Sequence, residues 1–89
     1  MNNERVIMVT GGARRIGAAI ISCLHQAGFR IVLHYRDSLD EAESLAAPLN
    51  SARSDSVRLL QADLSDVECL GGVVQRAISC WGRLDGLVN

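Results

Sequence analysis

Apolar residues follow two alternating patterns along this chain. Four short runs have the length and the β-branched content of strands, and they cover residues 6–9, 30–35, 56–61 and 84–89. Between them lie three longer segments in which apolar residues recur every three or four positions, the spacing of amphipathic helices. Because a helix separates each strand from the next, we expect the strands to be parallel. The pattern predicts an α/β fold, an open parallel sheet with helices on both faces, in the order βαβαβαβ.

Glycines predict where two of the helices end. The first helix is expected to run from near Arg14 to Gly28 and the third to stop at Gly82, because glycine readily adopts the left-handed backbone that ends a helix. The stripes expected to face the core are Ile16, Ala19, Ile20, Cys23, Leu24 and Ala27 in the first helix, Leu39, Ala42, Leu45, Ala46 and Leu49 in the second, and Val67, Leu70, Val74, Ala77, Ile78 and Trp81 in the third.

Two short sequences have the form of capping boxes, in which a serine caps the first turn of a helix and a glutamate three residues later reaches back to it. Ser38 with Glu41 predicts the start of the second helix, and Ser65 with Glu68 predicts the start of the third. Pro48 has no N–H to donate within a helix, so the second helix is predicted to end just before it, with a polar loop following.

The first strand runs into a glycine-rich turn, Thr10-Gly11-Gly12-Ala13-Arg14-Arg15-Ile16-Gly17. Its glycines let the backbone turn sharply and approach a ligand closely. The following helix directs its first N–H groups and the positive end of its dipole at this turn, which suits a pyrophosphate. A phosphate-binding P-loop is excluded, because Ala18 and Ala19 replace its lysine and hydroxyl residue. The turn predicts a Rossmann-type dinucleotide site, and a tight turn without a ligand is the alternative. The candidate residues are Gly11, Arg14, Arg15, Ile16 and Gly17.

The end of the second strand bears on which dinucleotide is bound. About twenty residues past the glycines, such folds place a carboxylate for a free ribose 2′-hydroxyl or a cation for a 2′-phosphate. Arg36 offers a planar, permanently charged fork to phosphate, and Arg14 or Arg15 could reach the same group. This favours NADP(H) as the cofactor. The preference reverses if Asp37 rather than Arg36 points at the ribose.

Two further groups of candidate residues follow the remaining strands. Asp63 and Leu64 come after the third strand, and Asn89 ends the fourth. In an open parallel sheet, ligands bind in the crevice beyond the carboxyl ends of the strands. All four strand ends are therefore expected to contribute to one site.

The charge balance, apolar runs and cysteines of the chain limit which kinds of molecule it is expected to bind. Nine basic and ten acidic residues give a net charge of −1, so neither nucleic acid nor an acidic membrane surface is expected to bind. No apolar run has the length of a membrane span and no signal-peptide pattern opens the chain, so a cytoplasmic protein is expected. The widely spaced Cys23, Cys69 and Cys80 predict reduced thiols, and no metal site is expected.

These motifs resemble the short-chain dehydrogenase/reductase family. The family has a T-G-x-x-x-G-x-G turn, an Asp-Leu or Asp-Val pair after the third strand and an N-N-A-G-like stretch after the fourth. Thr10-Gly11 with Gly17, Asp63-Leu64 and Leu87-Val88-Asn89 match these motifs in order and spacing. The resemblance covers essentially the whole chain. It implies a Rossmann-type fold, a nicotinamide cofactor and a homo-oligomer, commonly a tetramer.

Within the family, the turn with Arg15 in place of the middle glycine is similar to the pteridine reductase branch, as is the segment 33–38. Those enzymes use NADPH to reduce dihydropterins or dihydrofolate. The resemblance implies that Arg15 lies near the pyrophosphate and the pterin. It also implies a set of residues around the 2′-phosphate, namely His34, Tyr35, Arg36 and Ser38.

The family's catalytic Tyr-x-x-x-Lys pair is not matched here. The chain has no lysine, and its single tyrosine belongs to the second strand. No catalytic residue is therefore assigned, and residues 1–89 are expected to be the N-terminal portion of one NADP-binding domain in a longer enzyme. The expected function is NADPH-dependent reduction of a pterin by hydride transfer. The alternatives are a reductase of a 3-oxoacyl thioester or a sugar, and a non-catalytic dinucleotide sensor.

Overall fold

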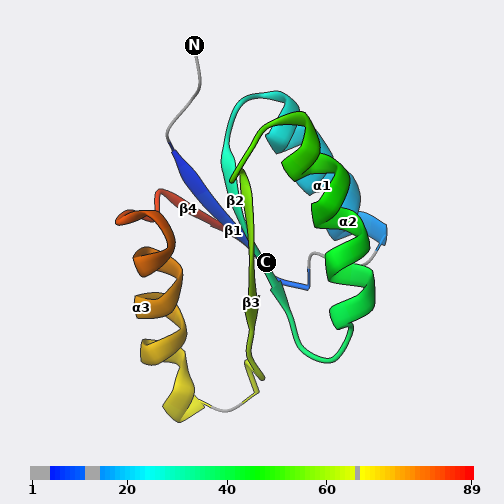
Figure 1. The fold of residues 1–89 in the computed structure, drawn as a ribbon. Coiled ribbons are helices and arrows are strands. Elements are labelled where there is room, and N and C mark those ends of the chain that lie inside the picture. The colour runs from blue at the N-terminus through cyan, green and yellow to red at the C-terminus, as the bar shows by residue number, and fades with distance from the viewer. Residues whose placement is uncertain (1–4, 12–14, 66) are drawn as a thin grey trace.

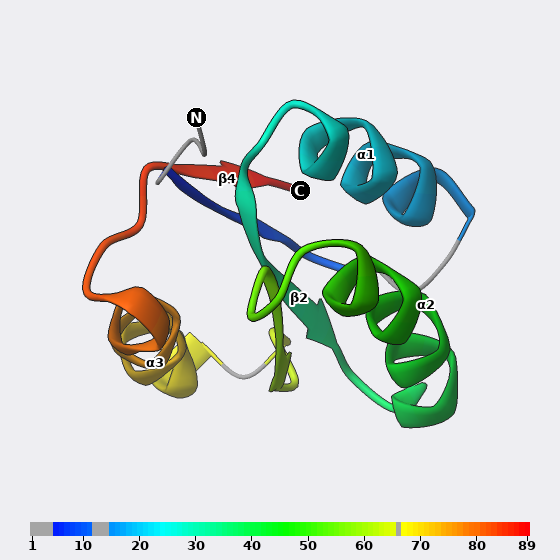
Figure 2. The same ribbon diagram turned by 45° about the horizontal axis from the view of Figure 1, so that its top comes forward.

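Four parallel strands form one sheet in the computed structural model, which describes residues 5–11, 15–65 and 67–89. The strands lie in the order β3-β2-β1-β4, and the helices cover both faces, with α1 and α2 on one and α3 on the other (Figure 1, Figure 2). This confirms the predicted α/β class. The elements are β1 Val6–Val9, α1 Arg15–Gln26, β2 Arg30–Tyr35, α2 Leu39–Ala52, β3 Val57–Gln61, the 3₁₀ turn η1 Val67–Cys69, α3 Leu70–Trp81 and β4 Gly86–Val88.

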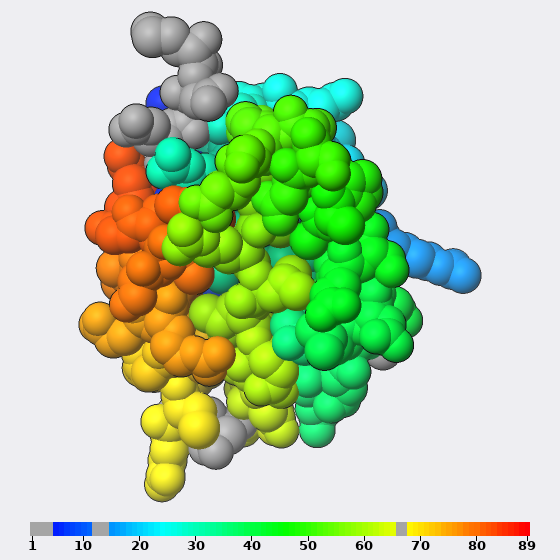
Figure 3. Space-filling model, in the orientation of Figure 1, coloured from blue at the N-terminus to red at the C-terminus, as the bar shows by residue number. Residues whose placement is uncertain are grey.

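The sheet separates two hydrophobic clusters, because successive side chains of a strand point to opposite faces. In β2, Val32 packs in the cluster on the α3 side, whereas Ile31 and Leu33 pack on the side of α1 and α2. Strand β3 is an outer strand of the sheet, and Figure 3 shows its side chains between α2 and α3. Burial on both faces explains why the strands read as nearly continuous apolar runs.

The predicted buried stripe of α1 is wrong in part. Ile21 and His25 are the buried residues of the helix, whereas Ile16 is 77% exposed. Ala19, Cys23 and Ala27 are also exposed, and Ile20 and Leu24 are half-buried. Apolar residues occupy two adjacent faces of this helix, and its packing on the sheet buries the face that contains Ile21. The helix ends as predicted, with Gly28 at φ 98° and the Phe29 N–H bonded to the Leu24 carbonyl.

The predicted end of α2 is also wrong, since the helix continues through Pro48 to Ala52. Pro48 lies on the exposed side of the helix, where water can reach the carbonyl that the missing N–H leaves without a partner. Ala42 and Ala46 are buried as predicted, but Leu39 is exposed. The Ser38 side chain makes no capping hydrogen bond, so the first capping box does not form.

The second capping box does not form either. Instead, the N–H and the hydroxyl of Ser65 both donate to the Asp63 carboxylate. The 3₁₀ turn η1 then precedes the start of α3. Val73 and Ala77 are the buried residues of α3, whereas Leu70 and Val74 of the predicted stripe are exposed. The predicted stop at Gly82 is confirmed, with φ 80°. None of the helices in the described ranges has the length and apolar character needed to cross a bilayer.

Candidate functional site at the carboxyl edge of the sheet

Every strand ends at the same edge of the sheet, because all pairings are parallel. Hydrogen bonds between residues just past the strands join these ends. At the β1–β4 end, the Thr10 N–H donates to the Val88 carbonyl at 2.9 Å and its hydroxyl donates to Asn89 Oδ1 at 2.8 Å. The predicted site residue Asn89 is thereby held beside the start of the glycine-rich turn.

Gly11 begins that turn in a conformation that suits glycine, with φ 62°. A Cβ built on Gly11 would meet no atom of the described residues within 4 Å, so the space beside this glycine is open on their side. The Gly11 N–H points into the protein and donates to His34 Nδ1 at 3.0 Å. The turn therefore leaves room for a ligand at Gly11 while the Gly11 amide is already bonded.

His34 is the residue that connects three strand ends. It lies in β2, the middle strand of the three, and only 5% of its surface is exposed. Nδ1 accepts from Gly11 after β1, and Nε2 lies 2.8 Å from the Ala62 carbonyl after β3. Both ring nitrogens are thus occupied within the protein, which differs from the expected position of His34 around a phosphate.

Arg36 lies beyond the end of β2 and is largely exposed. Its guanidinium approaches two carboxylates, with Nη2 3.4 Å from Asp63 Oδ2 and Nε 3.7 Å from Asp37 Oδ2. The side-chain amide of Gln61 donates to the Arg36 carbonyl at 2.8 Å and fixes the backbone there. The structure therefore brings Arg36 and Asp63 together across the β2–β3 end and leaves Asp37 beside the same guanidinium.

The Asp63 carboxylate is kept ionised by its neighbours. Hydrogen bonds from the Ser65 hydroxyl at 2.6 Å and the Ser65 N–H at 3.0 Å lower the pKa of Asp63 below its ordinary value, and the Arg36 charge adds to this effect. The charged Asp63 pairs with Arg36 in the structure. An anion that binds Arg36 must compete with it.

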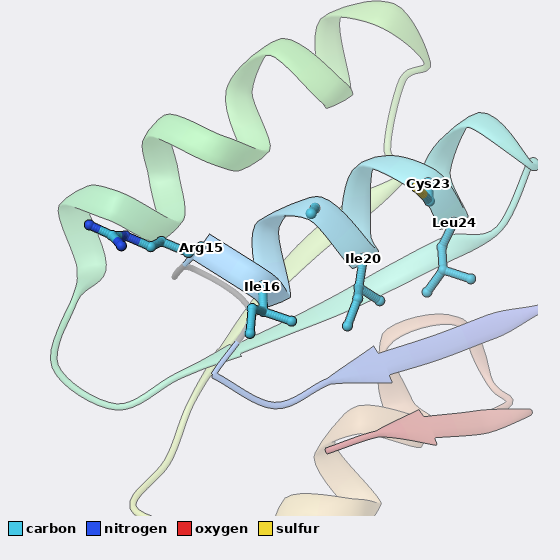
Figure 4. Close-up of a pocket in the computed structure, with 6 residues that line it drawn as sticks. Arg15, Ile16, Ile20, Cys23 and Leu24 are labelled. Carbon is cyan, nitrogen blue, oxygen red and sulfur yellow. The ribbon is translucent and has the colours of Figure 1, made fainter.

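The other predicted site residues lie at the same edge of the sheet and differ in how far they are exposed. Arg15 and Ile16 begin α1 and are exposed, with Arg15 extending away from the apolar stripe of that helix (Figure 4). Gly17, Tyr35 and Ser38 are half-buried, and Leu64 packs against the cluster on the α3 side. Arg14 lies outside the described residues. An apolar hollow runs along α1, lined by Arg15, Ile16, Ala19, Ile20, Cys23 and Leu24 (Figure 4).

Sequence reasoning placed these residues at one edge but missed the bonds between them. The role of His34 was missed because its partners are 23 and 28 residues away in the chain. A signal was present, since a histidine at the end of an otherwise apolar strand has two nitrogens that need partners when buried. The contact of Thr10 with Asn89 has no comparable local signal.

The chemistry of this edge suits an anionic ligand. An exposed guanidinium, an open glycine turn and the first N–H groups of α1 are all suited to phosphate. The described residues contain no cluster of three histidine, cysteine or carboxylate side chains that could hold a metal ion, and no disulfide forms among them.

The parallel sheet with helices on both faces is an α/β fold of the Rossmann type. Comparison with known proteins makes this more specific. The family model for short chain dehydrogenase matches residues 5–89, and the chain belongs to that family.

Several curated relatives are similar to the chain. Pteridine reductase 1 of Leishmania tarentolae is 40% identical over 94% of this chain and 35% of its own length. Versicolorin reductase of Emericella nidulans is 36% identical over 91% of the chain and 30% of its own length. The 3-oxoacyl-(acyl-carrier-protein) reductase FabG of Staphylococcus aureus is 29% identical over the whole chain and 36% of its own length. The chain spans about a third of the length of these relatives.

Proposed function

We propose that this chain forms the NADP(H)-binding portion of a short-chain reductase that reduces a pterin. The bound cofactor supplies the hydride, and the residues of this chain bind and orient the cofactor. The observation that carries the proposal is the exposed Arg36 guanidinium at the carboxyl edge of the sheet, next in the strand order to the Gly11 turn. The negatively charged 2′-phosphate of NADP(H) can pair with that cation, whereas the 2′-hydroxyl of NAD(H) carries no charge to pair with it.

Two further observations favour a pterin among possible substrates. The turn has Arg15 where a middle glycine is common, and a relative named pteridine reductase 1 is 40% identical over almost the whole chain. The Arg15 side chain is exposed at the start of α1 and extends away from the apolar stripe (Figure 4). A cation in that position can contact both a pyrophosphate and a planar, polar heterocycle.

The cofactor is tested by binding measurements on the protein that carries this sequence. Wild type should bind NADPH more tightly than NADH, and Arg36→Ala should lose roughly ten- to hundredfold in NADPH affinity, as expected for one charge-assisted contact. NADH affinity should change little. Arg5→Ala removes an equal charge just before β1, at the opposite edge of the sheet, and is the matched control. Equal affinities for the two cofactors in wild type would overturn the assignment.

The substrate is tested by oxidation of NADPH with dihydrobiopterin, with a 3-oxoacyl thioester as the second substrate. Turnover of the pterin, reduced in Arg15→Gly, supports the proposal. The second candidate is a 3-oxoacyl thioester reductase, which the similarity of FabG over the whole chain favours. Turnover of the thioester alone, with no effect of Arg15→Gly, would favour that candidate.

A further inference from the structure

We propose that His34 is a positioning residue that holds the glycine turn in its ligand-binding shape and does not itself bind the ligand. This role rests on the proposed NADP(H) function. Its basis is a pair of hydrogen bonds at the two ring nitrogens, in which Nδ1 accepts from the Gly11 N–H and Nε2 bonds to the Ala62 carbonyl. The imidazole is almost fully buried, at 5% exposure.

The two partners determine the state of the ring. A backbone N–H can only donate, so Nδ1 of His34 must accept from Gly11. A carbonyl can only accept, so Nε2 must carry the proton that is donated to Ala62. The neutral ring with its proton on Nε2 is therefore the form that satisfies both contacts. An imidazolium would place a second N–H against that of Gly11.

The position of His34 in the sheet explains why one side chain can do this. The pairing of β1 with β2 ends at Val9 and Leu33, and that of β2 with β3 ends at Tyr35 and Gln61. Gly11 lies beyond the paired residues of β1. The imidazole reaches it from the middle strand and supplies the hydrogen bond that the sheet no longer provides.

The consequence for a ligand follows from the direction of the Gly11 amide. Its N–H is bonded to His34, so among the described residues the N–H groups left to hold a phosphate over the turn are the first ones of α1. The side of Gly11 where a Cβ would project meets no described atom within 4 Å, so a ligand can approach the backbone there. His34 therefore acts on the ligand through the orientation of Gly11.

Two conservative variants separate the two hydrogen bonds. In His34→Asn, the side-chain oxygen lies near the position of Nδ1 and can still accept from Gly11, but the side chain is too short to reach Ala62. In His34→Gln, the side-chain nitrogen lies near the position of Nε2 and can still donate to Ala62, but the acceptor for Gly11 is lost. Each variant loses one buried hydrogen bond, so their thermal stabilities should fall by similar amounts.

The affinity for NADPH should distinguish the variants, because only one of them releases Gly11. We expect His34→Gln to bind NADPH roughly three- to tenfold more weakly than wild type, the range that one hydrogen bond is worth, and His34→Asn to remain within about twofold. His34→Phe, which loses both contacts, should bind at least as weakly as His34→Gln. The control is His25→Gln, at the other buried histidine, which should lower stability without changing the affinity.

The state of the imidazole provides a second readout. Nitrogen-15 NMR of wild type should show a His34 ring with an unprotonated Nδ1 and a protonated Nε2, with and without cofactor. A protonated Nδ1, or equal affinity losses in His34→Asn and His34→Gln, would overturn this role while leaving the proposed function intact. A wild-type protein that binds no dinucleotide would overturn the proposed function and this role with it.

Discussion

Replacement of Asp37 by asparagine should strengthen the binding of NADPH and leave that of NADH unchanged. The Asp37 carboxylate lies 3.7 Å from Nε of Arg36, the cation proposed to bind the 2′-phosphate. A phosphate that reaches this guanidinium also comes close to the negative charge of Asp37. Asparagine has nearly the same shape as aspartate and removes that repulsion, while a ribose hydroxyl carries no charge and should not respond.

The size of the effect follows from the geometry. A phosphate oxygen bonded to the guanidinium lies roughly 7 Å from the Asp37 carboxylate, the sum of the observed contact and one ordinary hydrogen bond. Both groups are exposed, so the dielectric of water applies, and the repulsion between unit charges at that distance is about 0.6 kcal/mol. The phosphate carries roughly 1.5 to 2 charges, which raises the repulsion to about 1 kcal/mol. At physiological salt, screening reduces this by about half or slightly more.

The assay is a titration of wild type and Asp37→Asn with NADPH and NADH at two ionic strengths. The variant should bind NADPH about twofold more tightly near 0.15 M salt and about fourfold more tightly near 0.01 M, because the Debye length grows from about 8 to about 30 Å. Glu43→Gln makes the same change in net charge at an exposed position of α2 and serves as the control. An NADPH affinity that stays constant at low salt, or a parallel gain for NADH, would refute the reasoning.

Two other perturbations test the turn and the stability of the fold. Gly11→Ala should cost about 1–2 kcal/mol of stability through its positive φ and weaken cofactor binding as well, whereas Gly82→Ala, also at positive φ with open space, should cost stability alone. Equal binding by both variants would contradict the site at the turn. Burial and the Arg53 charge lower the pKa of His25, so the folded state favours its neutral form and stability should fall as the pH drops below about 6.5. Denaturant unfolding between about pH 8 and 5 should show a smaller fall in His25→Gln, and identical profiles would contradict this.

The strands could be predicted from the sequence to within two residues or so, because each is a short apolar run with clear limits. The buried faces of the helices could not. In α1, Ile16 and Ile21 are both apolar, yet the first is exposed and the second buried. Local periodicity does not choose between two adjacent apolar faces, since the choice depends on the sheet and on α2. The second capping box was also missed, because the Ser65 N–H and hydroxyl both donate to the Asp63 carboxylate and hold the serine in a turn before α3.

In the candidate site, the strand pattern predicted which residues would lie at one edge of the sheet, and the fold determined their hydrogen bonds. Parallel strands alone placed Gly11, Arg36, Asp63 and Asn89 at one edge. Which groups face a ligand and which face the protein depends on strand register, which no local pattern reveals. His34 is the clearest case, because resemblance placed it around a phosphate, whereas the structure uses both of its nitrogens inside the protein.

The division of work at this edge follows from those bonds. The Gly11 amide is bonded to His34, so in the proposed function the described N–H groups left for a pyrophosphate are the backbone groups at the start of α1. In the proposed function the 2′-phosphate is bound by Arg36, and the two carboxylates beside this guanidinium would compete with that ligand. Cofactor choice can therefore be altered at Asp37 without disturbing the turn. A change at His34 should alter the binding of both dinucleotides, because both share the pyrophosphate.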